Sequence, residues 1–392
     1  MAALSAVTVL VGGAGACTSG GGGGGGDGSP RDFAELKRWG FAEWDRWAQR
    51  HGFHNQVVPG LWSAEEMGQA PPQQPAPAPE GTSPAPPSGD TSSSGSATPS
   101  GVTSPITPSG DTSPSAPSTP AAPSASSAPS AQPAPPPVAA QPVPRPYTSY
   151  PASGKVFMTA PGGGTGQCSA TVVADPEHPG KSNLVWTAAH CVHEGKGGDW
   201  YKNLVFVPAY NSSGAAGDHR KATLAEVAPL GQWWADRVIT SPLWTTEGTK
   251  GGDAANQYDF AVVKVRGPAG ETRSLEEVIG TAVPVWFDAP REQLAIQAWG
   301  YPAVAPFDGQ ELERCDSGRP GSRSFDPARP PMLVIGCTMT AGASGGGWFA
   351  DGPDGRQRLV SNTSIGTSAH TALNGPYLED VARQALAYIS RK

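Results

Sequence analysis

The sequence of 392 residues lacks several features that would point to other classes of protein. It has no block of Lys and Arg, and its formal net charge is −7, so it offers no electrostatic attraction for nucleic acid or anionic membranes. Its five cysteines include no Cys-x-x-Cys pair with matching histidines, which argues against a zinc site. The apolar run at residues 1–16 is too short for a transmembrane helix. We therefore expect no nucleic-acid partner, no metal and no organic cofactor.

Residues 69–146 contain almost no large apolar side chain. They consist mainly of Pro, Ser, Ala, Thr and Gly, and such a segment cannot offset the entropy of ordering by burial. Most of the 43 Pro lie in the first half of the chain, so the second half must build the core. We predict a disordered spacer over 69–146 and one globular domain over 147–392, with a Pro-rich ligand for a partner domain as the alternative role of the spacer.

The N-terminus has the pattern of an export signal. Residues 1–17 end in Ala14-Gly15-Ala16-Cys17, which resembles a bacterial lipoprotein signal, and a Gly-rich tether follows at 18–30. No Lys or Arg precedes the apolar run, and Ala14 stands where Leu is usual. We expect lipidation of Cys17 and a membrane tether through it; cleavage as an ordinary secretion signal and an uncleaved anchor stay open.

An island of large aromatic residues lies at 31–68. Its apolar residues roughly trace one face of a helix: Phe33, Leu36, Trp39, Trp44 and Trp47. A helix this short cannot bury such a face alone, so it must dock on the globular domain, another protein or a cell-wall component.

The pattern of the globular half predicts many short strands separated by Gly and Pro turns, followed by a helix from Tyr377 onward. This pattern predicts an all-β sandwich or barrel and not alternating βαβ units. The candidate strands are 168–173, 184–187, 204–207, 258–265, 293–300, 332–337 and 359–365.

Three segments carry candidate chemistry. A short apolar strand ends at His190 and Cys191, which suits a general base because imidazole exchanges protons near neutral pH. Asp259 opens an alternating apolar strand, with Asp253 as a competing carboxylate upstream. Ser344 lies in Gly342-Ala343-Ser344-Gly345-Gly346, where glycines allow a tight turn. In chain order these residues match a His, Asp and Ser nucleophilic triad.

On these motifs, residues from about Tyr150 to Lys392 resemble the trypsin/chymotrypsin-like serine peptidases. The resemblance implies two six-stranded antiparallel β-barrels followed by a C-terminal helix. It also implies that His190 is the base, Asp259 orients it, Ser344 is the nucleophile, and the backbone amides of Gly342 and Ser344 receive the oxyanion.

The four cysteines of the globular half form two plausible pairs, Cys168–Cys191 and Cys315–Cys337, and the first matches the family's bridge beside the histidine. Disulfides imply an oxidising, extracytoplasmic compartment. The substrate pocket implied by the resemblance comprises Thr338, Met339, Thr340, Ser361, Thr363 and Gly366.

Two departures from the family pattern limit the analogy. Thr338 stands where trypsin has Asp, so we do not expect cleavage after Arg or Lys; Ala343 replaces the Asp that pairs with a newly freed amino terminus in many animal members. The chain resembles the bacterial branch that includes glutamyl endopeptidases, but the histidine with which those read an acidic side chain is not recognisable.

The serine segment also fits the nucleophile elbow of α/β-hydrolases. That fold would require Asp351 or Asp354 with His370, and strand–helix alternation before the serine, which is absent. We therefore expect a monomeric serine endopeptidase with a polypeptide substrate, outside the cell or on its surface. A non-catalytic binding module and a zymogen that clips its own spacer are the alternatives. Whichever holds, residues 31–68 are either a docking helix or an inhibitory pro-segment.

Overall fold

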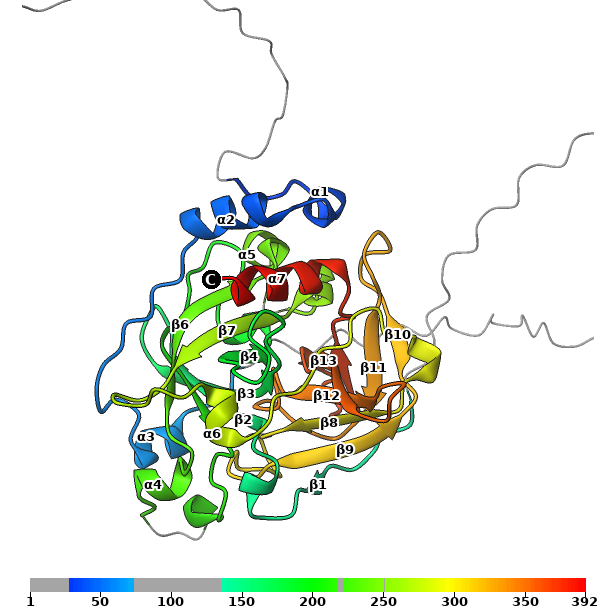
Figure 1. The fold of residues 1–392 in the computed structure, drawn as a ribbon. Coiled ribbons are helices and arrows are strands. Elements are labelled where there is room, and N and C mark those ends of the chain that lie inside the picture. Colours follow the sequence, from blue (N-terminus) through cyan, green and yellow to red (C-terminus); the bar gives the residue numbers. More distant parts are fainter. Residues whose placement is uncertain (1–27, 74–134, 218–220, 250) are drawn as a thin grey trace, which may run out of the picture.

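The computed structural model describes residues 28–73, 135–217, 221–249 and 251–392 (Figure 1). The predicted signal, Cys17 and most of the predicted spacer lie outside the described residues. Within the described part, no helix is both long and apolar enough to cross a membrane.

The first half of the globular domain is a closed antiparallel barrel. Its strands, in the order in which they pair around the barrel, are β2 (Ser153–Thr159), β3 (Thr165–Val173), β4 (Leu184–Thr187), β7 (Ala261–Arg266), β6 (Trp233–Thr240) and β5 (Lys202–Pro208). Successive residues point to opposite faces of a strand, and here both faces are buried: Val156 and Met158 belong to one apolar cluster and Phe157 to another. The outer face is therefore covered by other parts of the chain.

The second half contains two sheets. The five-stranded sheet has the order β1 (Gln141–Pro142), β9 (Glu313–Gly318), β8 (Ile296–Gly300), β12 (Gly347–Asp351) and β13 (Gln357–Asn362). The four-stranded sheet has the order β10 (Gly321–Arg323), β11 (Met332–Gly336), β15 (Ala372–Gly375) and β14 (Ile365–Gly366).

The predicted all-β fold with a six-stranded barrel and a C-terminal helix is confirmed, but the described strands of the second half form two separate sheets and not a second closed barrel. The segment at 135–142 lies along the free edge of β9 instead. Thr338, just beyond β11, donates its N–H to the carbonyl of Val138 at 3.0 Å, and β1 pairs with β9. A disulfide, Cys315–Cys337, joins the two sheets at this seam with 5.6 Å between the Cα atoms.

Some predicted boundaries also shift. The strand expected from Tyr258 begins at Ala261, because residues 254–258 form the 3-10 turn η4 (Ala254–Tyr258), whose first turn is capped by Asp253. The strand expected at 359–365 is split between β13 and β14, and the C-terminal helix α7 is Asp380–Ser390. Asp253 is thus a turn cap, and Asp259 is left free to face His190.

Short helices fill the connections: α4 (Leu224–Val227), α5 (Pro242–Glu247) and α6 (Leu275–Ile279). The aromatic island forms three helices instead of one, namely α1 (Phe33–Lys37), α2 (Phe41–Arg50) and α3 (Ala64–Gln69). Helix α2 begins after Gly40, whose N–H is capped by the side chain of Glu43 at 2.9 Å.

Residues 28–73, which we call the N-terminal strap, wrap around the first barrel. Helices α1 and α2 lie beside α7 (Figure 1), where Trp44 Nε1 donates to Gln384 Oε1 at 3.0 Å. Further along, Asn55 exchanges hydrogen bonds of 2.9 Å with the backbone of Leu204 on β5. The strap ends on β3, where Gln167 donates its N–H to Pro71 and accepts one from Gln73. The island therefore docks on the globular domain of its own chain.

The strap should contribute measurably to stability through its buried indoles. Trp44 is 1% exposed, whereas Phe41 on the same helix is 40% exposed. We expect Trp44→Ala to lower the free energy of unfolding by about 3 kcal/mol, as for large aromatic side chains deleted from a core, and Phe41→Ala to cost less than about 1 kcal/mol. Denaturant unfolding of both variants checks this, and equal losses would contradict a docked strap.

Candidate active site

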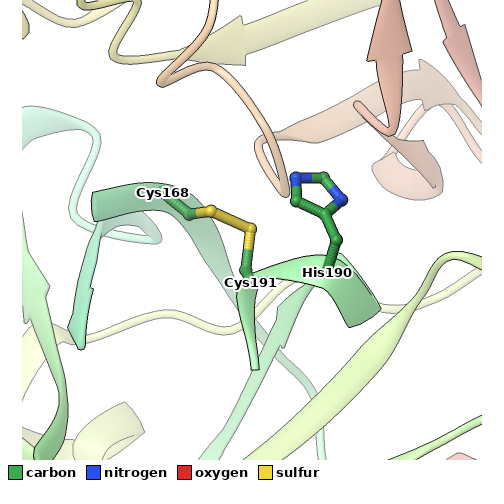
Figure 2. A group of neighbouring side chains, drawn as sticks. All are labelled: Cys168, His190 and Cys191. Carbon is green, nitrogen blue, oxygen red and sulfur yellow. A yellow bond between two sulfur atoms is a disulfide. The ribbon is translucent and has the colours of Figure 1, made fainter. Parts of the chain in front are cut away.

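His190 is delivered to the junction of the two halves by β4. The strand ends at Thr187, and the 3-10 turn η2 (Ala189–Cys191) follows. Cys191 is bonded to Cys168 of β3, with 6.1 Å between the Cα atoms, so the turn is tied covalently to the neighbouring strand (Figure 2). The imidazole next to this bridge is 5% exposed.

The ligand-type atoms of Cys168, His190 and Cys191 lie within 4.8 Å of one another. Metal ions bind cysteine as the thiolate, and both sulfur atoms here are already bonded to each other (Figure 2). This cluster therefore serves as a covalent brace for the histidine and has only one available ligand.

Asp259 holds His190 with both of its carboxylate oxygens. Oδ2 lies 2.7 Å from His190 Nδ1, and Oδ1 accepts the backbone N–H of His190 at 2.9 Å. The carboxylate is fully buried. A carboxylate on Nδ1 selects the tautomer that carries its proton there, which leaves Nε2 as the acceptor.

Asp259 is itself held by residues that the sequence did not single out for this role. Ser364 Oγ donates to Asp259 Oδ2 at 2.5 Å, and Asn362 Nδ2 donates to the Asp259 carbonyl at 3.0 Å. The indole N–H of Trp186 in turn donates to Asn362 Oδ1 at 2.9 Å. The signal for them is a run of four small polar residues, Ser361–Ser364, which are all buried after an apolar strand.

Ser344 lies in a loop with two glycines in the left-handed region, Gly342 at φ +101° and Gly345 at φ +78°. A Cβ on Gly345 would lie only 2.9 Å from the backbone nitrogen of Ala188, two residues before His190. The Ser344 carbonyl accepts the N–H of Ser169, the residue after Cys168, at 2.7 Å. The loop is thus packed against the two segments that the disulfide joins.

The imidazole atom that faces away from Asp259 has no protein partner. His190 Nε2 is buried, and among the described residues no hydrogen bond joins it to Ser344 Oγ or to another group. Nucleophile–base hydrogen bonds are often long or misaligned in enzymes without substrate. Nε2 therefore remains able to accept a proton.

The backbone amides of this loop differ in how they are used. The N–H groups of Ala343, Gly345 and Gly346 donate to carbonyls at 3.2, 2.7 and 3.0 Å. No described carbonyl or side chain accepts the N–H of Gly342 or of Ser344. Two unused donors on one loop beside a serine match the requirement for binding an oxyanion.

The predicted pocket residues before Ser344 differ in exposure. Thr338 is half-buried, and its Oγ1 accepts the N–H of Ala140 at 2.9 Å. Met339 is 1% exposed and packs in the core of the second half. Thr340 Oγ1 donates to the carbonyl of Val304 at 2.8 Å, which ties the loop to the segment at 301–310.

The predicted pocket residues after Ser344 are also largely engaged inside the protein. Ser361 Oγ donates to the Pro376 carbonyl at 2.7 Å, and Thr363 Oγ1 accepts the indole N–H of Trp348 at 2.9 Å. Gly366 of β14 is half-buried. Of the six predicted pocket residues, only Thr338 and Gly366 retain partial exposure.

The structure does not bring together the catalytic residues that an α/β-hydrolase would need. Asp354 forms an ion pair with Arg358 at 2.9 Å, and β12, which begins three residues after Ser344, continues into a hairpin with β13 instead of a helix. Asp351 pairs with Gln357 within that hairpin.

A closed antiparallel barrel beside a second β half, with a His–Asp pair and a glycine-bounded serine between them, defines a chymotrypsin-like protein. No protein-family model matches the chain, and no curated protein matches it. Solved structures do match. A thermostable serine protease from an extremophilic microorganism is 33% identical over 62% of this chain and 99% of its own, with a TM-score of 0.49.

Two further structures cover 64% of this chain. The protease Anisep from Arthrobacter nicotinovorans is 27% identical over 100% of its own length, with a TM-score of 0.49, and a Glu endopeptidase is 17% identical over 97%, with a TM-score of 0.44. Because 33% of the aligned residues are identical over 99% of the first protease, the chain belongs to the trypsin/chymotrypsin-like serine peptidases, a family of enzymes that hydrolyse peptide bonds.

The bridge beside His190 should matter for the site and not only for stability. Each disulfide closes a loop of similar length, with sequence separations of 23 and 22 between the partners, so replacing either pair by alanines should cost about 3 kcal/mol in the free energy of unfolding. We expect only Cys168→Ala/Cys191→Ala to slow the reaction of Ser344 with a fluorophosphonate, because only that bridge holds the turn of His190. Equal labelling rates in the two double variants would contradict this role.

Proposed function

We propose that this chain is a serine endopeptidase in which Ser344 is the nucleophile, His190 the general base and Asp259 the residue that orients the base. The observation that carries the proposal is the setting of His190: Asp259 binds both its Nδ1 and its backbone N–H, and among the described residues its buried Nε2 has no hydrogen-bond partner. A buried imidazole fixed in this tautomer can only accept a proton at Nε2.

The reaction follows from these positions. Ser344 Oγ attacks the carbonyl carbon of the scissile peptide bond, and its proton moves to His190 Nε2. The negative charge that develops on the carbonyl oxygen is received by the N–H groups of Gly342 and Ser344. The C–N bond then breaks, and the leaving amine takes the proton from Nε2. Water repeats the sequence on the acyl ester, which releases the acid and restores Ser344.

Specificity is proposed to rest on Thr338 and Gly366. Thr338 carries no charge and its hydroxyl is bound by the Ala140 N–H, so it offers no carboxylate for an Arg or Lys side chain of the substrate. Gly366 leaves an edge of β14 open to a substrate backbone. The wall of the proposed substrate pocket is then formed by internally packed residues, namely Met339, Thr340, Ser361 and Thr363.

The proposed location is outside the cytoplasm. Two disulfides suit an oxidising compartment, and secretion with a tether at Cys17 would provide it. We further propose that the enzyme acts as a monomer on polypeptides.

Covalent labelling tests the nucleophile. We expect a fluorophosphonate to modify the full chain at Ser344, located by peptide mass mapping, and to leave Ser344→Ala unmodified, because only an activated serine attacks phosphorus at a useful rate. Absence of label on a folded wild-type chain would instead favour a non-catalytic binding module. A single clip within residues 69–146 that accumulates in wild type but not in Ser344→Ala would point to self-processing.

The hydrogen bond from Ser364 to Asp259 should contribute to the rate. Ser364→Ala removes one of the donors to Oδ2 and leaves a buried carboxylate less well satisfied, so we expect the labelling rate to fall about tenfold. Ser182→Ala is the matched control, because that buried hydroxyl donates to the Val173 carbonyl and does not contact Asp259. Equal rates in the two folded variants would exclude Ser364 from the catalytic arrangement.

A further inference from the structure

Two side chains opposite each other on the first barrel reach into the second half. Lys155 of β2 and Ser169 of β3 are register partners, so their side chains lie on the same face of the sheet. Ser169 Oγ donates to the carbonyl of Gly342 and accepts the N–H of Tyr301, both at 2.8 Å. This pair therefore joins the first barrel to the loop that bears Ser344.

Lys155 is fully buried, and no described carboxylate lies within salt-bridge distance of it. Its ammonium donates to the carbonyl of Gly309 at 2.8 Å. It also lies over the rings of Phe157, Tyr210 and Tyr301, at 5.0, 4.5 and 5.7 Å from their centroids. No counter-ion among the described residues neutralises this ammonium; cation–π attraction and one hydrogen bond to a carbonyl stabilise it instead.

The carbonyl that Lys155 binds belongs to the loop at 301–310. Gly309 donates its own N–H to Pro302 at 2.9 Å, which closes this loop on itself. At the other end, Ala303 donates to the carbonyl of Ala341 at 2.6 Å. A displacement of Gly309 would therefore also move the residues that precede Ser344.

The same loop forms the support on which Gly342 rests. A Cβ on Gly342 would lie 2.6 Å from the Tyr301 carbonyl oxygen and 2.9 Å from the Ala303 nitrogen. A shift of residues 301–303 must therefore move the peptide of Gly342, whose N–H is one of the two unused donors.

We propose that Lys155 is a positioning residue for the oxyanion site, and that its ammonium fixes the loop at 301–310 against Gly342. This inference rests on the proposed function of Ser344. It explains why a lysine occupies a site where methionine would fill the space without burying a charge.

The protonation of Lys155 supplies a readout that a purely structural role would not move. Burial lowers the pKa of Lys155 to about 7, and the charge of Asp308 on the same loop works in the opposite direction. The other titratable groups that face the ammonium are the phenols of Tyr210 and Tyr301, whose pKa values burial raises, so both stay neutral here.

The contribution of Lys155 to stability depends on pH. The folded protein releases the Lys155 proton as the pH rises through about 7, whereas an unfolded lysine keeps it to about 10.4. Between these values the burial penalty disappears, so the contribution of Lys155 to stability becomes more favourable with rising pH. The labelling rate of Ser344 should fall over the same range, because the ammonium that fixes the loop is lost.

The experiment measures the rate constants for fluorophosphonate labelling of the full chain from pH 6 to 9, for wild type, Lys155→Met and Lys202→Met. Lys202 is an exposed lysine of β5 and serves as the matched control. We expect Lys155→Met to lower the maximal labelling rate about 10- to 100-fold near pH 6.5, with little change in reagent binding and no alkaline decline, since misplacing a catalytic group by about 1 Å has effects of this size. Lys202→Met should behave as wild type. A wild-type rate in folded Lys155→Met would overturn the proposal.

Asp308→Asn provides a second variant that retains Lys155. Removing this carboxylate should move the alkaline decline to lower pH, because Asp308 favours the charged form of Lys155. A decline at the wild-type pH would overturn the proposal. Absence of label on wild type would instead contradict the proposed function, so the two failures are distinguishable.

Discussion

Three consecutive residues at the start of β3 hold together the parts of the chain on which the site depends. Gln167 pairs through its backbone with the end of the N-terminal strap. Cys168 is bonded to the turn of His190, and Ser169 contacts both the Ser344 carbonyl and the Gly342 carbonyl. The proposed base, nucleophile and oxyanion donors are thus all held by contacts with one strand of the closed barrel.

The second constraint is the burial of Asp259. A fully buried carboxylate is costly unless its oxygens are satisfied, and here they accept from the His190 backbone, the imidazole and Ser364. The donors come from η2 in the first half and from the stretch after β13 in the second. The acid therefore helps to join the two halves as well as to orient the histidine.

Much of the candidate site could be predicted from the sequence because its residues lie in short linear motifs. His190, Asp259 and Ser344 each lie at a strand end or between glycines, and the strand at 184–187 was predicted with its observed bounds. The contacts of Lys155 with Gly309 and of Ser364 with Asp259 join residues that are 154 and 105 positions apart. The run of small polar residues at 361–364 draws attention to Ser364, but a single sequence does not show which distant residue either side chain contacts. The two separate sheets of the second half could not be predicted for the same reason. The pairing of residues 135–142 with β9 depends on tertiary contacts and not on any local pattern.

The proposed reaction requires that an oxyanion formed at Ser344 is bound by the N–H groups of Gly342 and Ser344. The most direct measurement is a crystal structure of the full chain after reaction with a fluorophosphonate. Phosphorus bonded to Ser344 Oγ, with its oxygen about 2.7–3.1 Å from both amide nitrogens, is the predicted result. Phosphorus on another residue, or a phosphonyl oxygen turned away from these two amides, would contradict it.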